Sequence, residues 1–129
     1  MPHHAHGTFT VKMEPATSAP ADGLTAFTME KQYEGDLVGS SKGEMISAGD
    51  YKLGAAGYVA IEHVTGTLDG KTGSFALAQM ATMNAGSRSL QVVVVPGSGT
   101  GQLQGITGTL TLKIENGHHF YDLNYSLPN

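Results

Sequence analysis

Hydrophobic and polar residues alternate with a period of two along much of the chain. In the segment 8–14, Phe9, Val11 and Met13 share one face, and polar side chains occupy the other. The same alternation recurs over residues 108–115, where leucines and an isoleucine alternate with threonines and a lysine. A period of two is typical of a β-strand with one buried face. We therefore predict a half-buried strand over each of these segments.

A longer alternating segment follows at residues 25–38. One face carries Phe27, Met29, Tyr33 and Leu37, with Lys31 as the exception among them. The pattern predicts a long strand that bends at Gly35 or Gly39, because glycine inside a strand often marks a bend. Residues 43–47 either continue this strand or begin another.

Four further strands are predicted at residues 58–68, 73–83, 90–95 and 119–127. Asp69-Gly70 and Asn116-Gly117 are strong signals for tight hairpin turns, because such turns require left-handed backbone conformations at both central positions. Residues 48–54 are predicted to form a turn. No segment shows a helical period over 11 or more residues.

Seven or eight short strands joined by tight turns predict an all-β protein, either a barrel or a sandwich. Glycine accounts for 18 of the 129 residues. Frequent glycines favour a small barrel, where strands coil sharply and bulge. We therefore predict one domain over residues 1–129, a single antiparallel barrel of about eight strands, with residues 1–6 as a flexible tail.

Composition excludes several classes of function. The chain has no cysteine, so a disulfide framework, a thiol nucleophile and a thiolate metal site are all excluded. The net charge of −4 argues against nucleic acid as a partner. No apolar stretch approaches a membrane span, and the first residues do not resemble a signal peptide. We expect a cytoplasmic protein that requires neither a cofactor nor a metal.

Several segments together resemble a family of small bacterial proteins that is known chiefly as a domain of unknown function. The segments are residues 7–11, 43–45, 57–70, 72–75 and 95–108, so the resemblance extends over nearly the whole chain. That family is placed with the allene oxide cyclase-like barrels, which include the plant dirigent proteins. The Gly-Thr-Gly-x-Leu-x-Gly-x-x-Gly run at 99–108 is similar to a glycine turn of that wider group.

The resemblance implies an antiparallel eight-stranded barrel, often oligomeric, with no agreed activity. One position departs from the family pattern. The family often has a histidine four residues beyond the phenylalanine of its Gly-Ser-Phe motif, and this chain has Gln79 there. A role for that histidine as an acid, a base or a ligand is therefore in doubt for this chain.

Glu62 is the best candidate for chemistry. It shares a face with Tyr58, Ala60 and Val64, so a carboxylate lies among largely apolar neighbours. If this face lines the barrel lumen, desolvation would raise the pKa of Glu62 and suit it to general acid or base catalysis. Alternatively, Glu62 forms a structural ion pair or faces solvent. Tyr58 on the same face is a candidate ligand-binding residue.

Three other residues are candidates for ligand binding. Gln79 shares a face with Phe75 and Leu77 on the partner strand, and its amide could orient a carbonyl or hydroxyl group; a satisfied core amide is the alternative. Arg88, the only arginine, could bind an anionic group in a bidentate manner or form a loop salt bridge. Glu44 shares a face with an apolar neighbour and is the third candidate.

The histidines are interpreted mainly as structural or exposed residues. His118 and His119 are adjacent, so in a strand they point to opposite faces. We interpret His119 as a partly buried structural residue. After removal of Met1, His4 becomes the third residue of a free N-terminus, an arrangement able to bind Cu(II) or Ni(II). A flexible tail without a metal is the preferred interpretation.

Three functions remain open. The first is a barrel that binds a small apolar or weakly polar molecule in its lumen. The second is a cofactor-free cyclase or isomerase that uses Glu62 as its acid or base. The third is a structural protein with a filled lumen. Because residues 58–65 and 90–95 are apolar on both faces, we also predict a homo-oligomer formed through the barrel walls.

Overall fold

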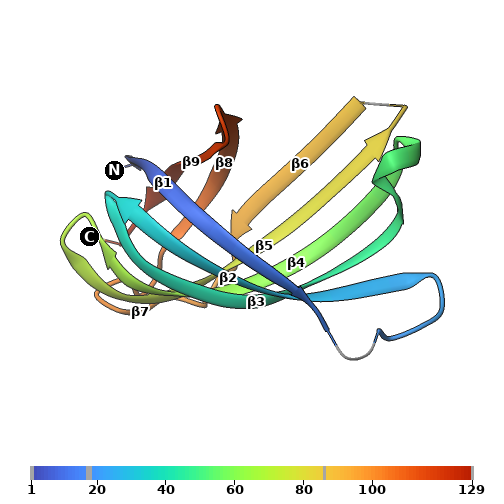
Figure 1. Cartoon of the computed structure of the whole chain (residues 1–129). Helices are drawn as coiled ribbons and strands as arrows, with labels where there is room; N and C mark the ends of the chain where they lie inside the picture. The colour runs from blue at the N-terminus through green and yellow to red at the C-terminus, as the bar shows by residue number, and fades with distance from the viewer. Residues whose placement is uncertain (1, 17–18, 86, 129) are drawn as a thin grey trace.

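The predicted all-β class is confirmed by the computed structural model, which describes residues 2–16, 19–85 and 87–128 (Figure 1). Strands account for most of this part of the chain, and one short 3-10 turn, η1 (Tyr51–Leu53), accompanies them. The strands are β1 (Pro2–Pro15), β2 (Leu24–Gly35), β3 (Leu37–Asp50), β4 (Ala55–Leu68), β5 (Lys71–Asn84), β6 (Ser87–Val94), β7 (Thr100–Gly101), β8 (Thr107–Glu115) and β9 (His118–Ser126).

Eight of these strands close into an antiparallel barrel. The order around the sheet is β4-β3-β2-β1-β9-β8-β6-β5, and β4 also pairs with β5, which completes the ring. The short β7 pairs with the start of β5 outside this ring. The first and last long strands, β1 and β9, are neighbours, so the wall closes where the two ends of the chain meet. The predicted barrel architecture is therefore confirmed.

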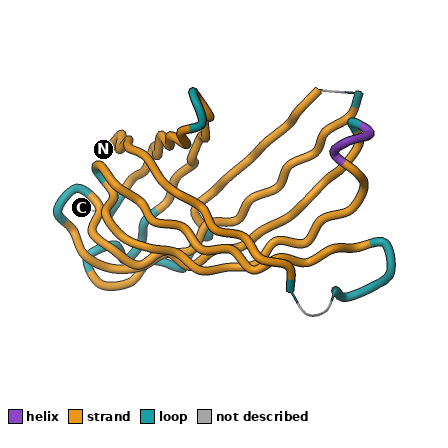
Figure 2. The backbone as a smooth tube through the Cα atoms, in the orientation of Figure 1, coloured by secondary structure: helices purple, strands orange, loops and turns teal. Residues whose placement is uncertain are grey.

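The predicted hairpin turns are present. Asp69 and Gly70 connect β4 to β5 with φ values of 48° and 84°, and Asn116 and Gly117 connect β8 to β9 with φ values of 52° and 78°. Positive φ at both central residues is the feature that aspartate, asparagine and glycine accommodate best. Figure 2 shows these turns and the other loops gathered where the strands end.

The long segment predicted over residues 25–38 is two strands. β2 ends at Gly35, whose φ of +106° is accessible to glycine, and β3 starts at Leu37 after a single intervening residue. The alternation continues across this corner, which explains why it indicated one bent strand. β3 extends to Asp50, so most of the predicted turn at 48–54 belongs to β3 and η1.

Residues 2–6, expected to form a flexible tail, instead begin β1. They are in antiparallel register with β9, where Ala5 lies opposite Leu123 and His6 lies opposite Asp122. Ala5 is fully buried, so the alternation of the strand extends into this segment. The polar histidines on the outward side hid this pattern, because one inward alanine is a weak hydrophobic signal.

The wall has one weak connection, between β6 and β8. Their pairing consists of two residue pairs, Val92 with Leu110 and Val93 with Thr109. Beyond them the two strands diverge, as the upper part of Figure 1 shows. By contrast, β4 and β5 are paired along their entire length. The barrel is thus well sealed at one end and splayed at the other.

The sealed end is filled by side chains. A buried cluster draws on every strand of the barrel and on the connection between β7 and β8: Ala5, Phe9, Tyr33, Leu37, Val64, Leu68, Phe75, Leu77, Val92, Val94, Leu103, Ile106, Leu110, Tyr121, Leu123 and Tyr125. Leu103 and Ile106 are almost fully buried and belong to that connection. Burial of this apolar surface stabilises the barrel and leaves room for a ligand only toward the splayed end.

Candidate functional site

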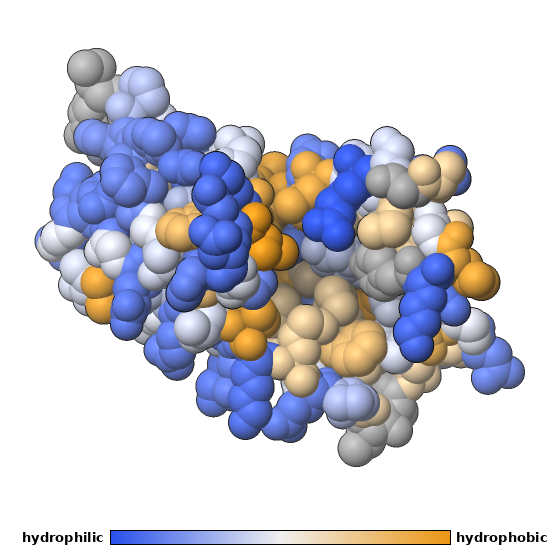
Figure 3. All heavy atoms as spheres, turned by 45° about the horizontal axis from the view of Figure 1, so that its top comes forward, coloured by the Kyte–Doolittle hydropathy of each residue, from blue (hydrophilic) through white to orange (hydrophobic). Residues whose placement is uncertain are grey.

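A hollow of about 430 Å³ occupies the lumen at the splayed end. Figure 3 looks toward this end and shows a depression near the middle of the view, with apolar side chains around it. Binding sites for small molecules usually have volumes of roughly 300–1,000 Å³. The hollow is therefore large enough for a small organic molecule.

Most of the wall is apolar and rich in methionine. The apolar lining residues are Phe9, Val11, Met13, Met29, Met45, Ala81, Met83, Leu90, Leu112 and Ile114. They come from strands around the barrel, and each occupies one of the alternating positions whose side chains point into the lumen. Methionine is unbranched and polarisable, so a wall of methionines can adapt to ligands of different shape.

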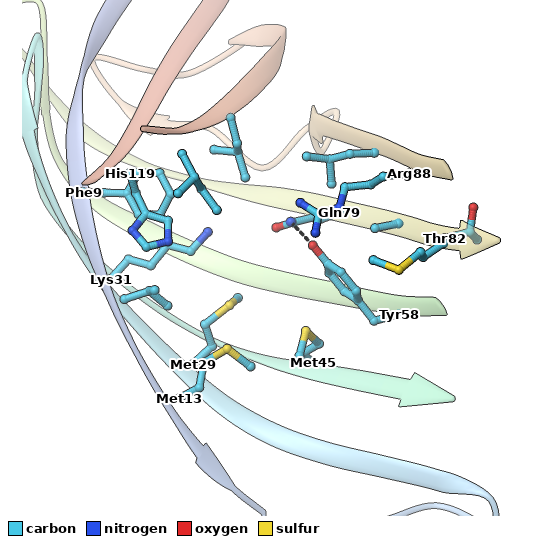
Figure 4. A pocket seen from close by; sticks show the side chains of 16 residues that line it. Phe9, Met13, Met29, Lys31, Met45, Tyr58, Gln79, Thr82, Arg88 and His119 are labelled. Carbon is cyan, nitrogen blue, oxygen red and sulfur yellow. Dashed lines mark hydrogen bonds between the residues drawn. The ribbon is translucent and has the colours of Figure 1, made fainter. Parts of the chain in front are cut away.

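Polar side chains lie on two opposite sides of the hollow. Figure 4 shows Lys31 and His119 on one side, and Tyr58, Gln79 and Arg88 on the other. The Gln79 amide donates a hydrogen bond to the Tyr58 hydroxyl, which fixes both side chains on the β4–β5 wall. Two cationic side chains and no carboxylate are among the lining residues. The hollow thus favours a ligand with an apolar body and a negatively polarised group.

A buried ion pair lies at the base of the hollow. Lys31 Nζ lies 2.8 Å from Glu62 Oε2, and the two side chains are only 6% and 3% exposed. The Tyr33 hydroxyl donates a hydrogen bond to the other carboxylate oxygen of Glu62. Lys31 Nζ also lies 5.0 Å from the centre of the Phe9 ring, within the range of a cation–π contact. Each charge of the pair is therefore compensated locally.

The strand register explains why Lys31 reaches Glu62 across an intervening strand. On β3, Gly43 is the residue directly opposite Glu62 of β4, and it is also directly opposite Met29 of β2. A glycine at this inward position leaves the space between β2 and β4 open. A β-carbon at Gly43 would lie 2.0 Å from the carbonyl oxygen of Ile61, so no other residue fits there without moving the backbone.

Burial sets the ionisation of Tyr33. Desolvation raises the pKa of the Tyr33 phenol far above its ordinary value of 10.0, and the negative charge of Glu62 raises it further. The phenol therefore remains protonated at neutral pH and acts as a hydrogen-bond donor to the carboxylate. This donor, together with the Lys31 ammonium, occupies both oxygens of Glu62.

Three of the predicted site residues are brought together by the fold. Tyr58, Gln79 and Arg88 all line the hollow, from β4, β5 and β6. Glu62 does not line it, because its carboxylate is paired beneath the hollow with Lys31 and Tyr33. Glu44 faces away from the lumen and lines a separate groove on the outer wall with Lys12, Lys42 and other charged residues. Its distance from the hollow follows from its outward parity on β3.

Lys31 and His119 line the hollow and were not selected as site residues from the sequence. Lys31 broke the apolar face of its segment, and that irregularity was the signal, because a lysine at an inward position requires a buried partner. The sequence predicts a partly buried structural residue at His119; the residue is partly buried, and it also lines the hollow at its rim. Its ring packs against Phe9 with a centroid separation of 5.1 Å. The alternation of the strand predicts that His119 faces inward, but it does not show where along the lumen the cavity lies.

No metal-binding cluster lies in the hollow among the residues that the structure describes. One group of potential ligands, His4, His6 and Asp122, lies on the outer side of β1 and β9, and none of the three lines the hollow. Within the described ranges, no helix has the length and apolar character needed to cross a membrane.

These features define a small antiparallel β-barrel with one end packed and the other hollow. The chain belongs to the family described as "Protein of unknown function (DUF3224)", whose model matches residues 5–125. The chain is similar to the crystal structure of a DUF3224 protein of unknown function from Shewanella oneidensis MR-1, determined at 1.84 Å resolution. The identity is 40%, the TM-score is 0.90, and the match covers 100% of this chain and 99% of the other. No curated protein matches this chain.

Proposed function

We propose that this protein binds a small amphipathic molecule in the hollow half of its barrel. The observation that carries the proposal is the contrast between the two halves of one lumen. One half is filled by the buried cluster, and the other holds a hollow of about 430 Å³ behind an adaptable methionine wall. Protein interiors are normally packed with few voids, so an apolar hollow of this size is the default binding-site hypothesis.

The polar groups of the lining suggest the chemistry of the ligand. Arg88 and His119 are donors at the rim, the Lys31 ammonium at the base is already paired with Glu62, and no lining residue is a carboxylate. A ligand with an apolar body of one or two rings, or a short chain, and a carboxylate, sulfonate, enolate or carbonyl oxygen would match both parts of the wall. The diverging ends of β6 and β8 provide a route of entry, because the backbone ladder between them is only two pairs long.

A cofactor-free cyclase or isomerase is the second candidate function, and it has less support. Glu62, the expected acid or base, has both carboxylate oxygens occupied, one by Lys31 and the other by Tyr33. A substrate in the hollow would have to displace Lys31 before it exchanged a proton with Glu62. The membership of the wider allene oxide cyclase-like group stays a prediction, with which an eight-stranded barrel is compatible.

A purely structural protein with a filled lumen is the third candidate. The packed end of the barrel fits this description, whereas the hollow end does not. The side chains needed to fill the hollow would have to come from a second chain or from a rearranged rim. The proposed binding function needs no such addition.

The proposal is tested with 1-anilinonaphthalene-8-sulfonate, a fluorescent probe with an apolar body and an anionic group. We expect saturable binding of one probe per folded chain. Ala81 lines the hollow on β5, so Ala81→Phe should weaken binding at least tenfold by filling the space. Ala55 is exposed on the outward side of β4, so Ala55→Phe is the matched control and should leave the affinity unchanged.

Cooperative thermal unfolding of each variant would show that the barrel is intact, because this probe also binds partly unfolded proteins. Absence of saturable binding to the folded wild-type chain would overturn the proposal, and so would an equal effect of the two variants. If the probe binds as expected, native mass spectrometry of protein purified gently from its source would identify the natural ligand as added non-protein mass on the folded chain.

A further inference from the structure

We propose that His4, His6 and Asp122 form a binding site for a divalent cation of the zinc class on the outer wall of the barrel. One potential ligand atom from each of the three residues lies within 4.8 Å of the others. His4 Nε2 lies 2.9 Å from Asp122 Oδ1. Two imidazoles and one carboxylate are a donor set that zinc accepts in proteins, with the remaining positions left to water.

The strands hold these residues in place without any loop. His4 and His6 are two residues apart on β1, so their side chains lie on the same side of the wall. Asp122 of β9 is the residue directly opposite His6 in the antiparallel register. The rings of the two histidines are 5.7 Å apart between centroids. A site built on paired strands is positioned more firmly than one on a mobile loop.

Binding an ion requires the ligand atoms to move by about an ångström. Zinc bonds to nitrogen and oxygen are about 2.0–2.2 Å long, so two ligand atoms at tetrahedral positions lie about 3.3–3.6 Å apart. The present limit of 4.8 Å exceeds this spacing by roughly 1.2–1.5 Å. The His4 and His6 side chains are 58% and 70% exposed, so they can rotate toward an ion without displacing the core.

Asp36 supplies a second carboxylate close to His6. Its Oδ2 accepts a hydrogen bond from the His6 backbone nitrogen at 3.0 Å and lies 3.7 Å from His6 Nδ1. Carboxylates beside a histidine ligand commonly orient its ring and increase its basicity. Asp36 would therefore leave Nε2 of His6 as the atom that binds the ion, and its negative charge would favour a cation nearby.

This site differs from a chelate at the amino terminus. A chelate of that kind uses deprotonated backbone nitrogens of the first residues, whereas residues 2–6 lie in strand register with β9. It would use neither Asp122 nor His6. Dependence of binding on Asp122, which is more than a hundred residues away in sequence, therefore distinguishes the two arrangements.

The position of the site suggests its role. β1 and β9 are the first and last long strands, and their pairing closes the barrel where the chain ends meet. An ion bound by both strands would fasten this closure. Because the three ligands come together only in the folded chain, the ion stabilises the folded state over the unfolded one.

The test uses the full chain and ZnCl₂ alone, first by calorimetric titration and then by thermal unfolding. We expect one zinc ion per chain and a rise in the unfolding midpoint that saturates with zinc. His4→Ala, His6→Ala and Asp122→Ala should each weaken binding at least tenfold and remove that rise. His63→Ala and His118→Ala, which remove exposed histidines elsewhere, are the matched controls and should bind as the wild type does.

Cobalt(II) provides a second measurement, because its visible absorption reports the coordinating atoms. We expect a spectrum of nitrogen and oxygen ligands that disappears in Asp122→Ala. The proposal is overturned if the wild-type chain shows no saturable zinc binding. Equal weakening by the control histidine variants would also overturn it, as would binding that persists in Asp122→Ala. The three residues lie outside the hollow, so no outcome of this test bears on the proposed ligand function.

Discussion

Lys31 and Glu62 form an ion pair of 2.8 Å between β2 and β4, with both side chains almost entirely removed from water. The pair lies where the packed half of the lumen gives way to the hollow half. Burying a single charge is costly, whereas a buried pair with a third hydrogen-bond partner is tolerated. Tyr33 is that third partner. The position of this trio determines how deep the hollow can be.

Breaking the pair should destabilise the barrel strongly. Glu62→Gln removes the negative charge and leaves the Lys31 ammonium buried without a counter-ion. Loss of one partner of a buried ion pair usually costs about 3–5 kcal/mol in the free energy of unfolding. We expect a loss within this range, measured by urea denaturation at pH 7.

The double variant Lys31→Met with Glu62→Met is the matched control. It removes both charges together, and such replacements of a buried pair are often neutral or stabilising. We expect most of the stability lost in Glu62→Gln to return. A double variant as unstable as the single one would show that the hydrogen bond from Tyr33, rather than the ion pair, is the main contribution of Glu62.

Tyr33 should make stability depend on pH in the alkaline range. Its pKa is raised in the folded state above the ordinary value of 10.0, chiefly by desolvation and next by the charge of Glu62. The stabilising contribution of this phenol is complete below pH 10, and it is lost as the pH rises above 10 because the unfolded chain then releases the proton more readily. Each such group contributes a slope of about −1.4 kcal/mol per pH unit.

The measurement is urea denaturation of the wild-type chain and of Tyr33→Phe between pH 8 and pH 11. Tyr33→Phe should show a shallower decline above pH 10 than the wild type. Tyr121 and Tyr125 also have raised pKa values, mainly through burial, so part of the decline should remain in the variant. Identical slopes in the two proteins would contradict the assignment of the effect to Tyr33.

Much of the fold could be predicted from the sequence because strand alternation is local. The period of two identified most strands, and the two tight turns fixed which neighbours form hairpins. The break at Gly35 could not be distinguished from a bend, since the same face stays inward on both sides. The β1–β9 closure could not be predicted because it joins residues far apart in sequence, and the inward side of residues 2–6 offers only Ala5 as an apolar signal.

The candidate site could be predicted only in part, for a physical reason. Parity tells which residues face the lumen, but not how far along the barrel axis each one lies. Glu62 and Tyr58 share one face of β4, yet Glu62 is in the buried layer and Tyr58 is at the hollow. Lys31 was visible as an anomaly, but its partner comes from a strand two places away. That register cannot be calculated from local patterns.

Arg88 should select ligands by charge. It is exposed at the rim of the hollow, where a guanidinium can approach an anionic group without burial. Arg88→Gln should weaken binding of 1-anilinonaphthalene-8-sulfonate by roughly three- to tenfold, since a hydrogen bond to a charged group contributes about 1.5–3 kcal/mol, less where solvent screens it. Binding of Nile red, an uncharged apolar probe, should change little. Fluorescence titrations of both probes make the comparison.

Lys113→Gln is the control for the change in net charge. Lys113 is exposed on β8, where it pairs with Glu115 at 3.2 Å, and it does not line the hollow. If Lys113→Gln reduced sulfonate binding as much as Arg88→Gln does, the effect would reflect the overall charge of the protein. If both probes weakened equally in Arg88→Gln, the arginine would shape the hollow instead of recognising charge.

An apolar patch on the outer wall supports the prediction of a homo-oligomer. Val59 and Ile61 of β4 are 52% and 59% exposed, and Met80 of β5 is 53% exposed. Val59 lies directly opposite Met80 in the strand register, so the three side chains form one surface. Contiguous exposed apolar side chains of this kind commonly mark protein–protein contacts. We predict that a second copy of the chain covers this surface.

Light scattering coupled to size-exclusion chromatography tests this prediction. The wild-type chain should have a mass above the 13.4 kDa of a monomer and should dissociate on dilution. Ile61→Lys should shift the mass toward the monomer, because a buried unpaired charge opposes association. Val38→Lys is the matched control, since Val38 is 58% exposed on β3 and lies apart from the patch in the strand register. A monomeric mass at every concentration of the wild type would rule out this interface and leave the patch as ordinary apolar surface.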